Sequence, residues 1–277
     1  MKQTELKGII TPILTPMNAD ESINTDELRT QIDRLIDGGV HGIFPFGTNG
    51  EGYILNEKEK CEVLEAAIDQ VKGRVPVYAG SGCISTQDTI RMSKEAEKLG
   101  ADVLSIITPS FAVASQKELY DHYVEVAKHV DTPIVLYNIP ARTGNKLLPE
   151  TVKKLAKDVD LIIGAKDSSG DWDNLKAYIT ETRELDKKFY VLSGNDSLIL
   201  PALKEGGVGG IAGCSNLRTV VGHGNNAQRD GGDHRANEVR HQGETPSSTH
   251  CDGVRTSHID NDRSIFRNVP EPNTRIG

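Results

Sequence analysis

The stretch LIIGAK, residues 161–166, is a short apolar run that ends in a lysine, and DSSG follows it at 167–170. An apolar run of this length that stops at a Ser-Ser-Gly turn is typical of a buried strand. Lys166 then lies at the strand end, where burying an ammonium costs free energy unless the group is paired or neutral. Burial also lowers the pKa of a lysine, and a neutral amine attacks carbonyl carbons to form Schiff bases. The alternative interpretation is a surface lysine just beyond the strand end.

Similar apolar runs recur up to about residue 212 and alternate with amphipathic stretches of helical period. Strands that alternate with helices form a parallel sheet, and eight such units in a chain of 277 residues favour a (β/α)8 TIM barrel over an open doubly wound sheet. The predicted strands are 8–11, 42–46, 76–79, 102–108, 133–137, 161–166, 189–193 and 208–212. The predicted helices are 25–36, with Thr25 as N-cap, 56–71, 86–99, 116–130, 149–157, 171–185 and 196–205.

Composition excludes several classes of partner. The net charge is −8 with a pI of about 5.5, and no basic patch is interleaved with aromatic residues, so nucleic acid and anionic membranes are poor partners. The N-terminal residues lack the apolar core of a signal peptide, and no run approaches the ~18 residues of a membrane span. The four cysteines are scattered and form no C-x-x-C pair, which suits reduced thiols in a cytoplasmic protein.

Two further motifs follow predicted strands. GTNGE (47–51) follows the second strand, and its successive backbone N–H groups, with the Thr48 hydroxyl, suit an anion such as a carboxylate. YNIPARTG (137–144) follows the fifth strand and offers the Tyr137 phenol and the Arg142 guanidinium, a bidentate partner for carboxylates. Barrel active sites are built from several strand ends at one face, so these motifs converge with Lys166. Taken singly, they could be a common turn, a packed rim residue or a surface ion pair.

The combination of motifs resembles the dihydrodipicolinate synthase / N-acetylneuraminate lyase family of class I, pyruvate-handling aldolases. The resemblance covers residues ~5–217 and implies the (β/α)8 fold and a lyase that acts through a lysine imine. The matching segments are GTNGE (47–51), YNIPARTG (137–144), GAKDSSGD (164–171), SGND (193–196) and GGVGGIAGCSN (206–216).

The resemblance also implies a role for each matching residue. Lys166 forms the imine with pyruvate, and Tyr137 shuttles protons between the imine and the incoming carbonyl. The imine nitrogen is the electron sink for enamine formation, so no metal or organic cofactor is expected. Thr48 and Asn49 are expected to bind the pyruvate carboxylate, and Thr48 is also expected to be a catalytic residue. Further substrate contacts are expected from Arg142, Gly194 and the carbonyl of Ile211.

This chain departs from the synthase pattern in two places. Synthases carry a Tyr-Tyr pair after Thr-Pro, and one tyrosine reaches the neighbouring subunit; here the stretch is Thr108-Pro109-Ser110-Phe111. An intersubunit tyrosine relay is therefore incomplete. Ile84 stands where synthases often place the asparagine that binds feedback lysine, so lysine inhibition is not expected. The resemblance implies a homo-oligomer, either a dimer or a tetramer.

The first functional hypothesis is 4-hydroxy-tetrahydrodipicolinate synthase-like activity, the condensation of pyruvate with aspartate semialdehyde in lysine biosynthesis. The alternative within the class is a 2-keto-3-deoxy sugar-acid aldolase or an N-acetylneuraminate lyase-type enzyme, which Phe111 favours. An alternative of another class is a catalytically inactive truncated barrel or a pyruvate-binding protein. A doubly wound nucleotide-binding protein is disfavoured because no G-x-G-x-x-G turn follows the first strand.

Residues 218–277 differ in composition from the rest. The chain has no lysine after Lys204 and no leucine after Leu217, and five of its eight histidines lie in the last fifth. The segment has no helical or strand period and cannot bury enough apolar surface to offset its ordering entropy. We therefore predict a catalytic barrel at 1–217 and an atypical tail at 218–277, disordered or out of frame, in place of the last helix and the C-terminal helical region. The irregular histidine spacing argues against metal binding.

Overall fold

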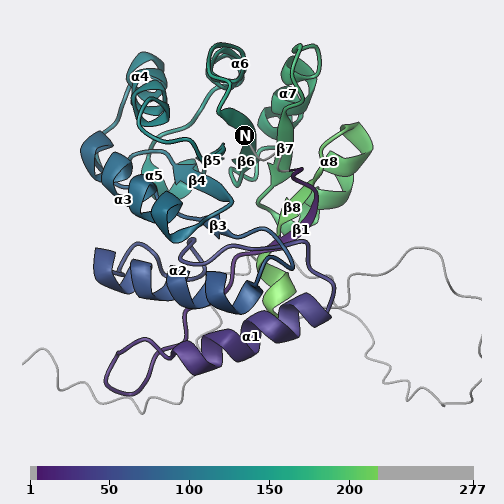
Figure 1. Cartoon of the computed structure of the whole chain (residues 1–277). Helices are drawn as coiled ribbons and strands as arrows, with labels where there is room; N and C mark the ends of the chain where they lie inside the picture. The colour runs from purple at the N-terminus through teal and green to yellow at the C-terminus, as the bar shows by residue number, and fades with distance from the viewer. Residues whose placement is uncertain (1–4, 218–277) are drawn as a thin grey trace, which may run out of the picture. The chain divides into compact units, whose positions relative to one another are not determined.

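Eight parallel strands form a nearly closed barrel in the computed structural model, which describes residues 5–217 (Figure 1). The strand order is β2-β1-β8-β7-β6-β5-β4-β3, and a single parallel bridge between Ile43 and Val77 joins β2 to β3. The predicted (β/α)8 barrel is confirmed, whereas the predicted tail lies outside the described residues. The strands are β1 (Gly8–Thr11), β2 (Gly42–Ile43), β3 (Tyr78–Ala79), β4 (Val103–Ile107), β5 (Ile134–Asn138), β6 (Ile162–Asp167), β7 (Tyr190–Ser193) and β8 (Gly209–Ile211).

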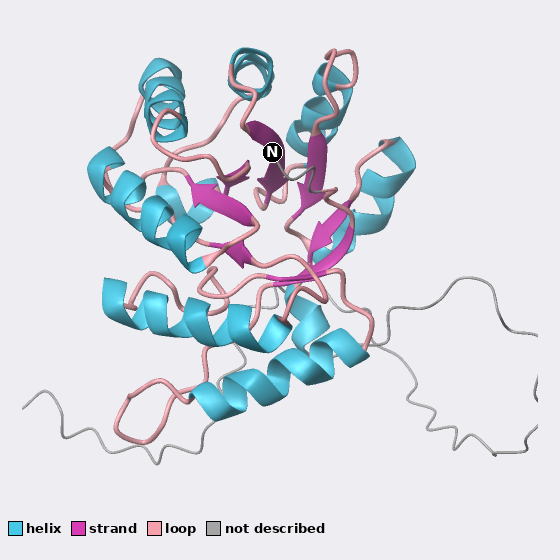
Figure 2. Cartoon of the chain, in the orientation of Figure 1, coloured by secondary structure: helices cyan, strands magenta, loops and turns pink. Residues whose placement is uncertain are grey.

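The helices surround the strands, as the cyan and magenta colours of Figure 2 show. Their ends follow local sequence: Asn56 and Glu59 form a reciprocal capping box, and Gly100 ends a helix at φ 104°, where residues with a Cβ are strained. They are α1 (Thr25–Asp37), α2 (Glu57–Val71), α3 (Thr86–Leu99), α4 (Gln116–Ala127), α5 (Pro140–Thr143), α6 (Pro149–Asp158), α7 (Trp172–Thr182) and α8 (Ile199–Glu205), with short 3-10 turns η1 (Asp196–Leu198) and η2 (Gly213–Asn216).

Three helix predictions need correction. The N-cap of α1 is Asn24 rather than Thr25, because the Asn24 side chain accepts a hydrogen bond of 2.9 Å from the backbone of Glu27. The predicted helix at 196–205 is divided into η1 and α8. The four-residue helix α5 was missed, since a single turn that begins at a proline is too short to show a helical period.

Apolar side chains pack in two layers. The larger cluster lies between the strands and the helices, and the smaller one contains no helix residue and fills the barrel lumen. Consecutive strand residues point to opposite faces, so strands such as β3, β4, β5 and β7 contribute to both layers. The lumen cluster consists of Leu6, Ile10, Phe44, Tyr78, Val103, Val135, Tyr190, Leu192 and Ile211.

The register between β5 and β6 contains one irregularity. Ile134 pairs with Ile162, but the next residue, Val135, pairs with Gly164, so Ile163 is an extra residue in β6. Ile162 belongs to the outer cluster, whereas Val135, the partner of Gly164, belongs to the lumen cluster. The bulge at Ile163 therefore turns Gly164, and with it Lys166, toward the lumen.

None of the helices among residues 5–217 is long and apolar enough to cross a membrane.

Candidate active site

Lys166 is buried near the carboxyl end of β6, with 4% of its surface exposed. Its Nζ lies 3.8 Å from the centroid of the Tyr137 ring and 5.4 Å from the centroid of the Phe44 ring. Tyr137 and Lys166 are register partners in β5 and β6, so strand pairing itself places the two side chains together. Aromatic faces attract a cation at these distances. The alternative of a surface lysine is excluded by this burial.

Tyr137 joins Lys166 to the turn after β2. Its hydroxyl lies 3.1 Å from Thr48 Oγ1, and the ring is 4% exposed. Burial acts to raise the pKa of Tyr137, but the Lys166 ammonium and the hydrogen bond with Thr48 outweigh it, so the pKa lies below that of an ordinary tyrosine. A phenol with a lowered pKa beside an amine can both give and accept a proton.

The turn that carries Thr48 is held by its own backbone. Thr15 Oγ1 donates a hydrogen bond of 2.6 Å to the carbonyl of Gly50, and a Cβ on Gly52 would lie 1.9 Å from the carbonyl oxygen of Phe46. The backbone N–H groups of Thr48 and Asn49 donate no hydrogen bond within residues 5–217. Two amide donors are therefore available for an anion beside Tyr137, as the sequence predicts.

Gly194 lies beside the buried Lys166, and Ile211 belongs to the same lumen cluster as Phe44. The Gly194 N–H donates to the Asp167 carbonyl at 2.7 Å, and a Cβ on Gly194 would lie 2.7 Å from Lys166 Cε. Only glycine leaves room for the lysine side chain there. Ile211 is 1% exposed and packs in the lumen cluster that contains Phe44.

Asn49 and Arg142 occupy the rim rather than the buried part of the site. Both side chains are exposed, Arg142 on α5 and Asn49 beside Gly213, where an added Cβ would meet the Asn49 amide nitrogen at 3.2 Å. Phe111 is 96% exposed with φ 79° and provides no phenol. The structure therefore groups Thr48, Tyr137, Lys166 and Gly194, with Asn49 and Arg142 farther out.

Two residues of the site were missed in the sequence. Phe44 supplies the second aromatic face beside Lys166, and its place two residues after the buried Gly42 is the signal that could have found it. Ser168 Oγ is buried and has no hydrogen-bond partner within residues 5–217; a Cβ on Gly194 would lie 1.8 Å from it. A Ser-Ser-Gly segment is typical of a turn, and that pattern gives no sign of a buried hydroxyl beside the lysine.

Comparisons with known proteins agree with this geometry. Residues 5–244 match the model of the "Dihydrodipicolinate synthetase family". A 4-hydroxy-tetrahydrodipicolinate synthase of Methanopyrus kandleri is 41% identical over 214 residues, which is 77% of this chain and 70% of the relative. An uncharacterized DapA-like lyase of Halobacterium salinarum is 38% identical over 219 residues, 78% of this chain and 70% of the relative.

The solved structures give the same result. YagE, a prophage protein of Escherichia coli K12 that belongs to the dihydrodipicolinic acid synthase family, was crystallised in complex with pyruvate. It aligns with a TM-score of 0.76 and 35% identity, covering 79% of this chain and 73% of that one.

Proposed function

Because this chain belongs to the dihydrodipicolinate synthetase family of class I, pyruvate-dependent lyases, we propose that Lys166 forms an imine with pyruvate and that Tyr137 moves the protons. The family acts through a lysine Schiff base and uses no cofactor. The observation that carries the proposal is the buried contact of Lys166 Nζ, 3.8 Å from the Tyr137 ring centroid, with the Tyr137 hydroxyl 3.1 Å from Thr48 Oγ1.

The reaction can be followed bond by bond. The Lys166 amine adds to the ketone carbon of pyruvate, and the ketone oxygen leaves as water. A methyl proton then leaves, and the electrons of that C–H bond form the enamine while the protonated imine nitrogen takes up the displaced pair. The enamine carbon bonds to an aldehyde carbon, whose oxygen accepts a proton. Addition of water releases the product and restores Lys166.

The chain supplies groups for each of these steps. Tyr137 is placed to deliver and remove protons because its hydroxyl is close to Lys166 and Thr48. The N–H groups of Thr48 and Asn49 suit the pyruvate carboxylate, and Gly194 leaves room for the imine-bearing side chain. Ile211 lines the lumen below, and Arg142 at the rim suits a carboxylate of the second substrate.

For the aldehyde partner, we propose aspartate semialdehyde first, which would place the enzyme in lysine biosynthesis. Support comes from the relative of Methanopyrus kandleri, which is named a 4-hydroxy-tetrahydrodipicolinate synthase. With this activity we propose a cytoplasmic enzyme, since its four cysteines form no C-x-x-C pair. We also propose that it assembles as a dimer or tetramer, as the resemblance to the family implies.

One observation favours a second candidate, a 2-keto-3-deoxy sugar-acid aldolase or N-acetylneuraminate lyase-type enzyme. The buried Ser168 hydroxyl beside Lys166 makes no well-aligned hydrogen bond within the described residues, although it is near enough to Tyr137 to help lower the pKa of that phenol, and a poorly satisfied buried hydroxyl costs about 1–3 kcal/mol. A substrate hydroxyl close to the reacting carbons would satisfy it. Replacement of a tyrosine by Phe111 points the same way, because the synthase relay loses a phenol.

The proposal is tested by trapping the imine. We expect pyruvate with borohydride to add the mass of reduced pyruvate to one lysine, mapped to Lys166. Lys166→Met should abolish the adduct. Lys187→Met is the matched control, since Lys187 is half-buried on another face with its Nζ 2.7 Å from the Val159 carbonyl. An unmodified Lys166 in the folded protein would refute the proposal and favour an inactive barrel.

The aldehyde is identified separately. Turnover with aspartate semialdehyde and pyruvate would support the synthase, whereas cleavage of 2-keto-3-deoxygluconate or N-acetylneuraminate would support the second candidate. Ser168→Ala should lower the rate with hydroxylated substrates and still allow the imine to form, because the Lys166 amine itself is unchanged.

A further inference from the structure

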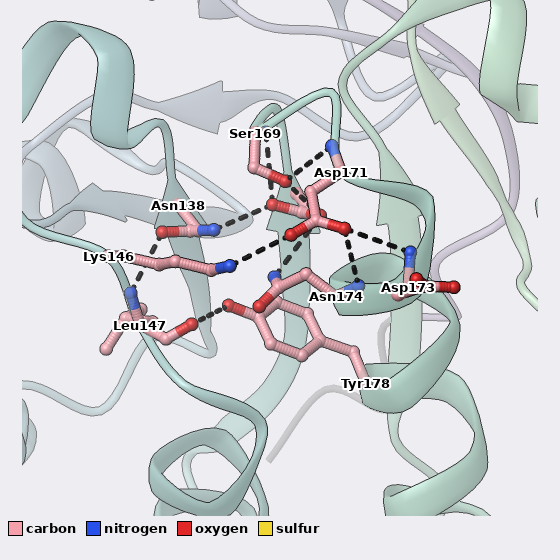
Figure 3. Close-up of polar contacts among 9 residues, drawn as sticks. Asn138, Lys146, Leu147, Ser169, Asp171, Asp173, Asn174 and Tyr178 are labelled. Atoms are coloured by element: carbon pink, nitrogen blue, oxygen red, sulfur yellow. Dashed lines mark hydrogen bonds and ion pairs between the residues drawn. The ribbon is translucent and has the colours of Figure 1, made fainter.

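The carboxylate of Asp167 is the centre of a buried polar network directly behind Lys166. Asp167 is 3% exposed and follows Lys166 in β6, so its side chain points away from the lumen. Its Oδ1 accepts hydrogen bonds from Asn138 Nδ2 at 2.7 Å and from the Ser169 backbone at 3.1 Å. Its Oδ2 accepts from Ser169 Oγ at 2.9 Å and Asn174 Nδ2 at 3.4 Å. Figure 3 shows the partner residues converging between β5, β6 and α7.

The pairing of β5 with β6 positions residues on both sides of the sheet, in the lumen and outside it. Tyr137 is the register partner of Lys166, and Asn138 is the register partner of Asp167. The Asn138–Asp167 hydrogen bond therefore joins the two residues that directly follow the proposed catalytic pair. Asn138 Oδ1 also accepts from the backbone of Leu147 at 3.0 Å, which fixes the segment after α5 (Figure 3).

Asp167 also fixes the loop between β6 and α7. Ser169 bonds to it through both backbone and side chain, and the Ser169 hydroxyl accepts from the backbone of Asp171 at 3.1 Å (Figure 3). Asp171 is the N-cap of α7 and forms an ion pair with Lys146 at 3.0 Å. Ser168 lies between the two anchored residues, so its hydroxyl is held beside Lys166.

A carboxylate is a costly way to hold two strands together. Burial raises the pKa of Asp167, in spite of hydrogen bonds from Asn138, Ser169 and Asn174 that lower it. Within residues 5–217 no cation forms an ion pair with Asp167, so its charge is held by neutral donors alone. Buried charges are weak contributors to stability, and apolar residues of similar size often replace them without loss. Stability alone therefore does not account for a hydrogen-bonding side chain at this position.

We propose that Asp167 is a positioning residue, whose bond to Asn138 holds the ends of β5 and β6 in the register that keeps Tyr137 against Lys166. This inference rests on the proposed function, since it assigns Asp167 to proton transfer between that pair and the bound pyruvate. Asp167 itself does not touch the reacting atoms. Loss of this residue should therefore slow the removal of a methyl proton, the step that needs Tyr137, more than it weakens the binding of pyruvate.

The test separates imine formation from proton transfer. Borohydride trapping measures the imine on Lys166, and NMR in D2O measures deuterium uptake into the pyruvate methyl group. Asp167→Ala should lower the exchange rate at saturating pyruvate about 10- to 100-fold, because small misplacements of reacting groups have effects of that size. The pyruvate concentration for half-saturation should change little. Asp167→Asn keeps an oxygen for Asn138 and should restore most of the exchange rate.

Asp171→Ala is the matched control. It removes an acid from the same loop and the cap of α7, but leaves the bond between Asn138 and Asp167. Its exchange rate per folded molecule should equal that of the unmodified protein. If Asp167→Ala does not fold, Asn138→Ala removes the same bond from the other strand. If both single variants fold, the double variant with Asp167→Ala and Asn138→Ala should lose little further exchange rate, because the two substitutions break the same contact.

The outcomes distinguish this inference from the function on which it rests. Unmodified protein without a pyruvate adduct would overturn both. An adduct in the unmodified protein, with Asp167→Ala exchanging deuterium at the same rate, would overturn the positioning role alone. So would equal losses in Asp167→Ala and Asp167→Asn, because those would trace the effect to charge and not to the bond between the strands.

Discussion

The two ends of the barrel lumen are built from the same strands but have opposite chemistry. At the amino end, Val103, Val135 and Tyr190 pack against each other with Leu6 in an apolar plug. At the carboxyl end, Lys166 and Tyr137 are equally buried but polar. The residues at the amino end can be replaced by other apolar residues, and such changes affect only the packing free energy. The carboxyl end holds groups whose burial is unfavourable, and this difference separates the residues that serve stability from those that serve chemistry.

The largest expected effect is at Lys166. Lys166→Met keeps a long flexible side chain but removes the amine, so activity should fall by more than about 10³-fold. The free energy of unfolding should stay equal or rise, because a buried amine is replaced by an apolar group. Steady-state assays and urea unfolding test the two parts. Loss of stability together with activity would show that the carboxyl end also serves stability.

Tyr137→Phe should have the next largest effect. The ring beneath the Lys166 ammonium remains, while the hydroxyl next to Thr48 is lost, so proton transfer should slow about 10²- to 10³-fold. Deuterium exchange into pyruvate reports this step. Thr48→Val, which removes only the partner of that hydroxyl, should have a smaller effect in the same direction. Unchanged exchange in Tyr137→Phe would exclude this phenol as the proton carrier.

Leu6→Ala tests the amino end of the lumen. Leu6 is buried in the lumen cluster, so its truncation should lower the free energy of unfolding by about 2–5 kcal/mol. Activity per folded molecule should stay close to that of the unmodified protein. A thermal or urea melt gives the first quantity, and an assay below the melting range gives the second. A large drop in activity without loss of stability would contradict the division of the lumen.

The smallest expected effect belongs to neither end of the lumen but to the outer helices. His122, in α4, is buried with its Nδ1 2.9 Å from Thr86 Oγ1, and burial lowers its pKa from 6.5 to about 4. Below the ordinary pKa the unfolded state gains a proton that the folded state does not, so the free energy of unfolding decreases as the pH falls. The loss from this group should be about 2 kcal/mol at pH 5.

His122→Gln provides the comparison for that pH effect, because glutamine can keep the bond to Thr86 but does not titrate. Urea unfolding at pH 7.5 and pH 5 should show a smaller loss for the variant than for the unmodified protein. Equal losses in both would mean that other groups set the acid sensitivity. Neither result should alter imine formation per folded molecule, which keeps this effect apart from the chemistry at Lys166.

Much of the fold could be predicted because apolar runs and glycine ends mark each strand and helix. The strands β4 to β8 lie within one or two residues of the predicted ranges, whereas β2 is shorter because the chain turns from Pro45 onward. Thr48, Tyr137 and Lys166 could be predicted to converge because parallel strands end at one face.

Other parts of the site could not be predicted from the sequence. Ser168 lies next to Lys166 only after the strands are in register, and no local pattern states that register. The network around Asp167 depends on Asn138, Ser169 and Asn174, whose separation along the chain conceals their contact. The run LIIGA before Lys166 is apolar throughout, so it contains no alternation that would show which way Lys166 points.

That direction depends on Ile163, the extra residue in β6. Counting along the strand, Ile162 faces the helices, and without an extra residue every even-numbered position after it, including 166, would face them too. The bulge reverses this parity, and deleting Ile163 would only make the pairing regular, with Lys166 still opposite Tyr137. Deleting Ala165 instead would place Lys166 opposite Leu136, which belongs to the outer cluster, and would turn the lysine toward the helices. Between the bulge and Lys166, a change in length is therefore more damaging than a change in identity, and an ancestor could gain or lose the chemistry there by a single codon.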